Sequence, residues 1–96
     1  MKTEHVLNLL KKNINTINRM GVKSLAVFGS TARNEAAPSS DIDILVIFDS
    51  SPTFDQYIET KFYLEDLLDC KVDLVIQDGL KPLIRKEVEK EAIYVA

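Results

Sequence analysis

The sequence predicts one α+β domain with an α/β-like alternation of elements: a small mixed β-sheet covered by helices. Its 96 residues have the length of a single domain, taken as residues 1–96. Segments with apolar residues at helical spacing alternate with short runs rich in Val, Ile and Leu. Hydrophobic residues make up 46% of the chain and charged residues 28%, as in folded globular proteins. This alternation predicts a sheet packed against helices, and it leaves the order of the strands open.

The first third of the chain predicts a helix, a strand and a brief second helix. Apolar residues at helical spacing predict a helix over 3–20, with Thr3 capping its start and Gly21 ending it. Residues 24–28, SLAVF, predict a short buried strand. A brief helix over 30–34 is expected directly after that strand.

The remaining elements continue the alternation after a loop over 35–40. Residues 41–49, DIDILVIFD, predict a long and strongly apolar strand. Thr53 is placed to cap the next helix, and Pro82 suits the first turn of the last one. The other predicted elements are a helix over 54–69 that uses Phe54, Ile58, Phe62, Leu64 and Leu68, a strand over 71–78, a helix over 81–91 with Leu80, Ile84 and Val88 on one side, and a C-terminal segment over 92–96 docked against the sheet.

Two carboxylates at the start of the strand over 41–49 form the first candidate site. Successive side chains of a strand point to opposite faces, so Asp41 and Asp43 share one face. Like charges held this close repel each other, and burial increases the repulsion. A divalent cation that prefers carboxylate oxygens, such as Mg²⁺, relieves it.

A third acid, Asp73, lies between Val72 and Leu74 in the strand over 71–78. An aspartate inside such a strand is costly unless it has a partner. Pairing of this strand beside the strand of Asp43 would bring three carboxylates together. Three carboxylates suffice for two magnesium ions about 3.5–4 Å apart, the arrangement used for in-line phosphoryl or nucleotidyl transfer.

The turn after the first strand is a candidate anion site. Gly29 lets a phosphate approach the backbone without a side chain in the way. Ser30 opens the short helix, whose N-terminus offers free N–H groups to an anion. Arg33 is the only basic residue between Lys23 and Lys61, and its guanidinium can clamp a terminal phosphate. Taken alone, the glycine–serine pair is equally typical of an ordinary strand-to-helix turn, and the arginine of a solvated surface residue.

These motifs together resemble a known family. A glycine–serine pair at 29–30, ten further residues and the Asp-Ile-Asp triplet at 41–43 match the Gly-Ser-x10-Asp-x-Asp signature of the DNA polymerase beta-like nucleotidyltransferases. The surrounding sequence is most similar to the minimal nucleotidyltransferases (MNT proteins), and the resemblance covers nearly the whole chain. One position departs from the family: members often carry Arg-Gly where this chain has Arg33-Asn34, although asparagine tolerates left-handed backbone.

The resemblance implies a role for each candidate residue. Gly29 and Ser30 would hold the triphosphate of ATP, the substrate. Asp41 and Asp43 would bind both of two Mg²⁺ ions. Asp73 would complete the site of the ion that activates the acceptor hydroxyl.

The resemblance also implies a protein partner. MNT proteins of this size are commonly paired with HEPN proteins in prokaryotic toxin–antitoxin modules, where the HEPN protein is the RNase toxin. Members of the class transfer AMP from ATP to a tyrosine of that toxin. The implied protein is an ATP-dependent protein adenylyltransferase in a hetero-oligomer with its toxin. The alternative is a non-catalytic antitoxin that neutralises its partner by binding and occlusion.

Charge and hydropathy exclude several other classes of protein. A net charge of −3 argues against an extended nucleic-acid groove, which needs a basic face. No apolar run is long enough to span a bilayer, and the amphipathic N-terminus does not resemble a signal peptide, so a cytoplasmic protein is expected. The remaining polar residues are interpreted as structural, including His5, Cys70 and an exposed helix surface made by Lys86, Glu87, Glu89, Lys90 and Glu91.

Overall fold

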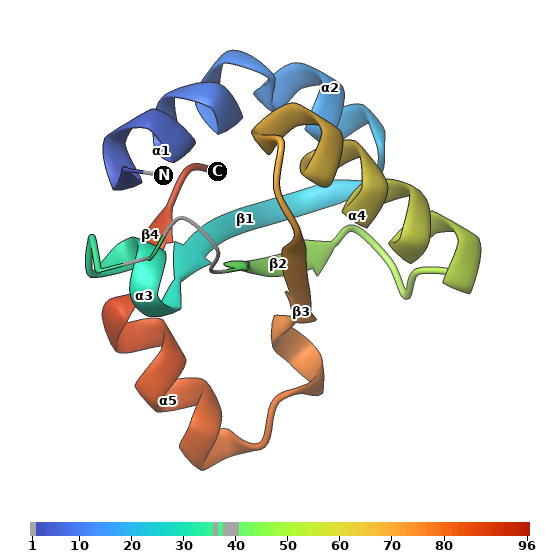
Figure 1. Ribbon diagram of the computed structural model, residues 1–96. Helices are drawn as coiled ribbons and strands as arrows, with labels where there is room; N and C mark the ends of the chain where they lie inside the picture. Colours follow the sequence, from blue (N-terminus) through green and yellow to red (C-terminus); the bar gives the residue numbers. More distant parts are fainter. Residues whose placement is uncertain (1, 36, 38–40) are drawn as a thin grey trace.

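Four strands form one mixed sheet in the computed structural model, which describes residues 2–35, 37 and 41–96. The sheet order is β3-β2-β1-β4, with β1 at Val22–Phe28, β2 at Ile42–Phe48, β3 at Val72–Ile76 and β4 at Ile93–Tyr94. β2 runs parallel to β3, whereas β1 runs antiparallel to both β2 and β4 (Figure 1). The predicted mixed sheet is confirmed, and β2 lies in its interior between β1 and β3. Most of the predicted loop over 35–40 lies outside the described residues.

Helices lie on both sides of this sheet. Figure 1 shows α1, α2 and α4 above the sheet and α5 below it, with α3 at the end of β1. The described residues form α1 (Thr3–Lys12), α2 (Ile14–Arg19), α3 (Gly29–Ala32), α4 (Phe54–Leu68), a short 3-10 helix η1 (Gln77–Gly79) and α5 (Pro82–Glu91). None of these helices is long and apolar enough to cross a membrane.

The helix predicted over 3–20 is divided at Asn13, which ends α1 and precedes α2. The Asn13 side chain donates a hydrogen bond to the Leu9 carbonyl oxygen at 2.8 Å, and its backbone N–H turns to Leu10. Asparagine competes for backbone groups in this way, which interrupts the helix. The predicted cap is also wrong, because Lys2 occupies the cap position without a side-chain hydrogen bond and the Thr3 hydroxyl instead donates to the Thr31 carbonyl oxygen.

The core lies between the upper face of the sheet and α1, α2 and α4. Alternate residues of β2 supply its centre, because Ile42, Ile44, Val46 and Phe48 all point to the same face and are buried. They pack with buried residues of β1 and β3 and of the three helices: Val6, Leu10, Ile17, Val22, Leu25, Val27, Leu64, Leu68, Val72 and Leu74. Asp43 therefore lies on the opposite face of β2, which is the side of the sheet where α5 lies.

The apolar stripes predicted for α4 and α5 are only partly correct. In α4, Leu64 and Leu68 are buried, but Phe54, the first residue of the helix, and Phe62 are exposed. In α5 no residue is buried, and Leu83 and Ile84 are 80% and 52% exposed. Helix α5 thus contacts the sheet without adding to the core.

The ends of the last elements agree with the sequence. The Thr53 side chain accepts a hydrogen bond from the Gln56 N–H at 3.1 Å and caps α4 as predicted. Pro82 stands at the first turn of α5. The C-terminal segment docks as predicted: β4 pairs with β1, and the Val95 N–H donates to the Leu25 carbonyl oxygen at 2.9 Å.

Candidate active site

Strand pairing places Asp43 between two other candidate segments. On one side its register partner is Phe28, the residue just before Gly29. On the other side its partner is Asp73, because β2 and β3 run parallel with these two residues opposite each other. The turn after β1, the start of β2 and the start of β3 therefore meet at one place in the sheet.

The carboxyl group of Asp43 experiences an unfavourable electrostatic environment. Partial burial raises its pKa above the ordinary value, and the charges of Asp73 and then Asp41 raise it further. A hydrogen bond between the Asp43 and Asp73 carboxyl groups also favours the protonated form. Asp41 and Asp73 themselves are exposed. The ionised form of Asp43 is thus disfavoured here, and a bound cation would favour it.

These carboxylates suit a magnesium ion because they are oxygen ligands and lie close to one another. Asp43 and Asp73 are opposite residues on adjacent strands, and Asp41 influences the same carboxyl group. Among the described residues, no three His, Cys, Asp or Glu side chains already form a group that could hold a metal ion. Mg²⁺ commonly uses only one or two carboxylates and completes its shell with water and substrate phosphates. The pair on β2 and β3 matches that pattern of ligands.

Gly29 is required by both conformation and space. Its φ of 68° lies in the left-handed region that favours glycine. A Cβ atom at this position would overlap the carboxylate of Asp43. The group that approaches the Gly29 backbone in this structure is therefore the Asp43 side chain, a reason for glycine that local sequence does not reveal.

The short helix begins one residue earlier than expected, at Gly29, so Ser30 is its second residue. The Ser30 carbonyl oxygen accepts the Glu35 N–H at 2.8 Å, which closes the turn after α3. Asn34, the departure from the family pattern, has a φ of 58°, so the expected left-handed conformation is present. Its side-chain oxygen also lies 3.4 Å from the Thr3 N–H at the start of α1. A glycine at this position could not make that contact.

Arg33 lies beside Gly29 but forms ion pairs within the chain. Its guanidinium lies 3.1 Å from the Glu35 carboxylate and 2.8 Å from that of Glu91. Hydrogen bonds to Glu35 and then Glu91 raise the pKa of Arg33. The other carboxylate oxygen of Glu91 accepts the Gly29 N–H at 2.9 Å.

Glu91 is a member of this site that sequence reasoning missed. Its predicted place on an exposed helix surface is wrong, because the C-terminal end of α5 brings its carboxylate to the turn after β1. No local pattern signals this, since 62 residues separate Glu91 from Gly29.

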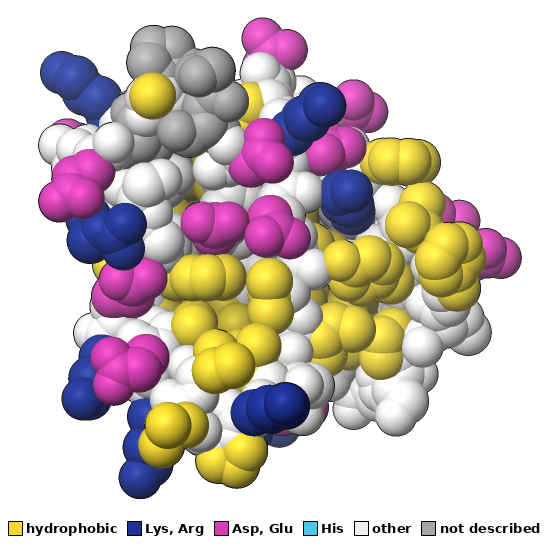
Figure 2. Space-filling view, turned by 60° about the horizontal axis from the view of Figure 1, so that its bottom comes forward, with side chains coloured by type: hydrophobic (Ala, Val, Ile, Leu, Met, Phe, Trp, Pro, Cys, Tyr) yellow, Lys and Arg dark blue, Asp and Glu magenta, His cyan; other side chains and the backbone are white. Residues whose placement is uncertain are grey.

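Acidic side chains and an apolar area lie next to each other on the α5 side of the molecule. Figure 2, which turns the lower side of Figure 1 forward, shows acidic groups bordering a broad hydrophobic area. Helix α5, which carries the exposed residues Leu83 and Ile84, lies on this side. The carboxylates are thus accessible from a surface with apolar character.

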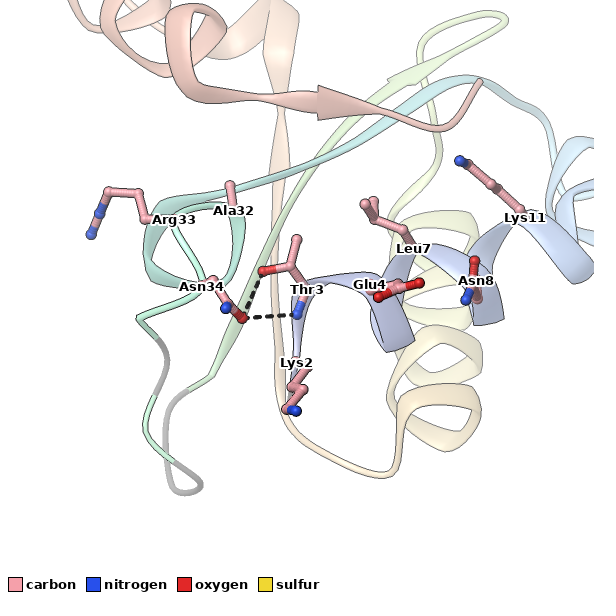
Figure 3. A pocket seen from close by; sticks show the side chains of 9 residues that line it. All are labelled: Lys2, Thr3, Glu4, Leu7, Asn8, Lys11, Ala32, Arg33 and Asn34. Atoms are coloured by element: carbon pink, nitrogen blue, oxygen red, sulfur yellow. Dashed lines mark hydrogen bonds between the residues drawn. The ribbon is translucent and has the colours of Figure 1, made fainter.

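A pocket of about 710 Å³ lies apart from these carboxylates, between α1 and the turn after α3 (Figure 3). Thr3, Leu7 and Asn34 are among the residues that line it, whereas Asp41, Asp43 and Asp73 are not. Arg33 also lines this pocket, and in Figure 3 its guanidinium extends to the side away from Thr3 and Leu7. We therefore place the candidate active site at the carboxylates and not in this pocket.

Comparisons with known proteins bear on the family and on the fold. The family model described as "Nucleotidyltransferase domain" matches residues 7–95. The protein adenylyltransferase MntA of Thermococcus cleftensis is 45% identical over 92 residues, which are 96% of this chain and 91% of that protein. A solved structure named provisionally as a minimal nucleotidyltransferase has a TM-score of 0.85 and 38% identity, over 97% of this chain and 95% of the other. At 20% identity, the structure of a tri-AMPylated HEPN toxin with its MNT antitoxin from Shewanella oneidensis has a TM-score of 0.68, over 94% and 71% of the two chains, and shows a shared fold.

Proposed function

This chain belongs to the nucleotidyltransferase domain family as a minimal nucleotidyltransferase, and we propose that it transfers AMP from ATP to a tyrosine of a HEPN-type RNase toxin. The transfer depends on Mg²⁺ and neutralises the toxin. The observation that carries the proposal is the register of β1, β2 and β3, which brings Asp43, Asp73 and Gly29 together. The name of the Thermococcus relative supports the adenylyl transfer, and the Shewanella complex supports the choice of partner.

Each residue of the site has a task in this reaction. Gly29, Ser30 and Arg33 bind the triphosphate through backbone N–H groups and the guanidinium. Asp43 and Asp73, with Asp41 beside them, would hold magnesium. When bound, Mg²⁺ neutralises charge on the phosphates and lowers the barrier to attack.

The reaction exchanges one bond to the α-phosphorus for another. The tyrosine oxygen forms a bond to that phosphorus, the bond from phosphorus to the pyrophosphate oxygen breaks, and pyrophosphate leaves. The proton of the hydroxyl passes to solvent. The chain contributes by holding the reacting atoms in line, which is the main task in transfers of this kind.

The test is a mass measurement on the partner. A HEPN protein, taken as the candidate partner, is incubated with this protein, ATP and Mg²⁺, and its intact mass is expected to rise by one or more AMP units. Asp43→Asn should abolish the gain while the complex still forms. Asp66→Asn, an equal change on the exposed side of α4, serves as the matched control and should leave transfer unchanged.

Neutralisation by occlusion is the second candidate function. The exposed apolar residues Leu83 and Ile84 of α5, the helix on the same side of the sheet as Asp43, favour it. They offer a surface to which a partner can bind without any transfer of AMP. In that case the toxin's mass stays unchanged, and Asp43→Asn silences it as well as the wild-type protein does. An unchanged toxin mass would contradict the proposed AMP transfer, and equal silencing by Asp43→Asn would show that neutralisation does not need it.

A further inference from the structure

Glu91 contacts both of the groups that the proposed function assigns to phosphate. Its Oε1 atom accepts the Gly29 N–H at 2.9 Å. Its Oε2 atom accepts a hydrogen bond from Nη1 of Arg33 at 2.8 Å. One carboxylate thus spans the backbone donor and the guanidinium, which shows that these two donors converge on a single anionic group.

Glu91 also adds negative charge beside the aspartates. Its charge is among the influences that raise the pKa of Asp43, so it lies within electrostatic reach of that carboxyl group. Figure 1 shows the C-terminal end of α5 next to α3, and the two helices are in contact. The Glu91 side chain is 33% exposed, which leaves its charge partly shielded from solvent. An incoming polyphosphate therefore meets the negative charge of Glu91 at the two donors that it would itself use, the Gly29 N–H and the Arg33 guanidinium.

The Gly29 N–H can serve one strong acceptor at a time. A triphosphate that uses this N–H has to take it from Glu91, and it has to share Arg33 with Glu35. We infer that Glu91 is an internal competitor of the triphosphate, which holds the Gly29 N–H and Arg33 until a nucleotide displaces it. This inference rests on the proposed function, because it concerns the same anion site.

The fold allows Glu91 to leave at low cost. It is the last residue of α5, a helix in which no residue is buried. Its partner Arg33 is exposed, and ion pairs between exposed groups are weak. Displacement of the Glu91 side chain therefore does not require the core to open.

The test compares Glu91→Gln with the wild-type protein. Glutamine keeps the size of the side chain and an oxygen that can accept the Gly29 N–H, but it carries no charge. We expect ATP and tripolyphosphate to bind about 3- to 10-fold more tightly to Glu91→Gln, measured by titration calorimetry with Mg²⁺. Glu87→Gln is the matched control, because it makes the same charge change on the same helix at a residue paired with Lys90. Its affinities should equal those of the wild-type protein.

The inference is overturned if Glu91→Gln binds ATP and tripolyphosphate no more tightly than the wild-type protein does. Weaker binding would identify Glu91 as a residue that positions the turn for phosphate. The tripolyphosphate titration separates this failure from failure of the proposed function, because it needs the anion site but no transfer. A second measurement uses the wild-type protein alone. In NMR titrations with tripolyphosphate, the Gly29 amide and the Glu91 side-chain carboxyl signals should shift together, and a Glu91 signal that stays in place while Gly29 shifts overturns the inference.

Discussion

Asp43 connects the three parts of the site through strand pairing, electrostatic interaction and direct contact. It pairs across the sheet with Phe28 and Asp73, and its carboxylate occupies the volume beside the Gly29 backbone. Burial and neighbouring acids make its ionised form unfavourable. A residue held in this way is retained at a cost to stability, which is common at functional sites.

The first prediction concerns the charge of Asp43 in metal-free buffer. Its pKa is raised in the folded protein, so folding favours the protonated carboxyl. The contribution of Asp43 to the free energy of unfolding is then most favourable below the pKa of the unfolded state, which is near 3.8. That contribution is lost as pH rises through the pKa of the folded state. Asp43→Asn removes this penalty and should raise the free energy of unfolding at pH 7 by at most about 1 kcal/mol. Urea unfolding at pH 7 and pH 3 should show a gain at pH 7 that shrinks at pH 3. A lower stability of Asp43→Asn at pH 7 would instead identify the carboxylate as a structural hydrogen-bond acceptor.

The second prediction concerns the space beside Gly29. Gly29→Ala places a Cβ atom against the Asp43 carboxylate at a positive φ, so it should lower the free energy of unfolding by about 1–2 kcal/mol or more. Part of that cost comes from the carboxylate and should disappear when Asp43→Ala is present. Chemical unfolding of the two single variants and the double variant measures this coupling. Strictly additive losses would mean that the backbone conformation alone requires glycine.

At the scale of elements, helix ends and strand starts position the site. Helix α4 begins after a threonine cap and ends at Leu68, and the next residue, Asp69, has a left-handed φ of 54°. The chain then turns directly into β3, and the Glu65 carboxylate accepts the Val72 N–H at 2.9 Å. The end of α4 therefore sets where β3 begins and, with it, where Asp73 lies.

The third prediction tests that helix end. Glycine adopts left-handed backbone without steric cost, so Asp69→Gly should raise the free energy of unfolding by about 0.5–1 kcal/mol. Asp66→Gly makes the same substitution three residues earlier, inside α4, and should lower it by about 0.3 kcal/mol, because glycine is a poorer helix former than aspartate. Thermal unfolding of both variants gives the comparison. A loss in Asp69→Gly would show that the aspartate side chain itself stabilises the helix end.

At the scale of the whole molecule, the two sides of the sheet differ. The upper side holds the core, whereas the lower side carries α5, the acidic groups and exposed apolar residues (Figures 1 and 2). The chain also has a net charge of −3. A polyphosphate is therefore repelled by the protein until a cation neutralises part of the charge.

The fourth prediction follows from this repulsion. ATP should bind weakly in EDTA and more tightly with Mg²⁺ or Mn²⁺, by about tenfold or more, since the cation links phosphate oxygens to the carboxylates. Calorimetry in matched buffers measures the two affinities. Asp43→Asn should lose most of the metal-dependent gain, while Asp66→Asn should keep it. Equal affinities in EDTA and in Mg²⁺ would contradict the two-ion hypothesis.

Much of the fold follows from the sequence because local signals determine it. The apolar strand β2, the cap at Thr53 and Pro82 at the start of α5 depend on residues within one turn or one strand, and each is confirmed. The break at Asn13 was missed because a side-chain hydrogen bond to Leu9 overrides an apolar pattern that continues through it. The roles of Asp41, Asp43, Asp73, Gly29, Ser30 and Arg33 stay predictions that the experiments above test.

The sequence by itself determined which residues could do chemistry, because aspartates inside apolar strands and a glycine before a short helix are locally costly or distinctive. Only the tertiary structure decided how they meet. Strand order sets Asp73 opposite Asp43, the Asp43 carboxylate explains why residue 29 is glycine, and α5 brings Glu91 onto Gly29 and Arg33. The physical reason is distance along the chain: contacts between residues 14 to 62 positions apart depend on the packing of whole elements, and no local pattern encodes them.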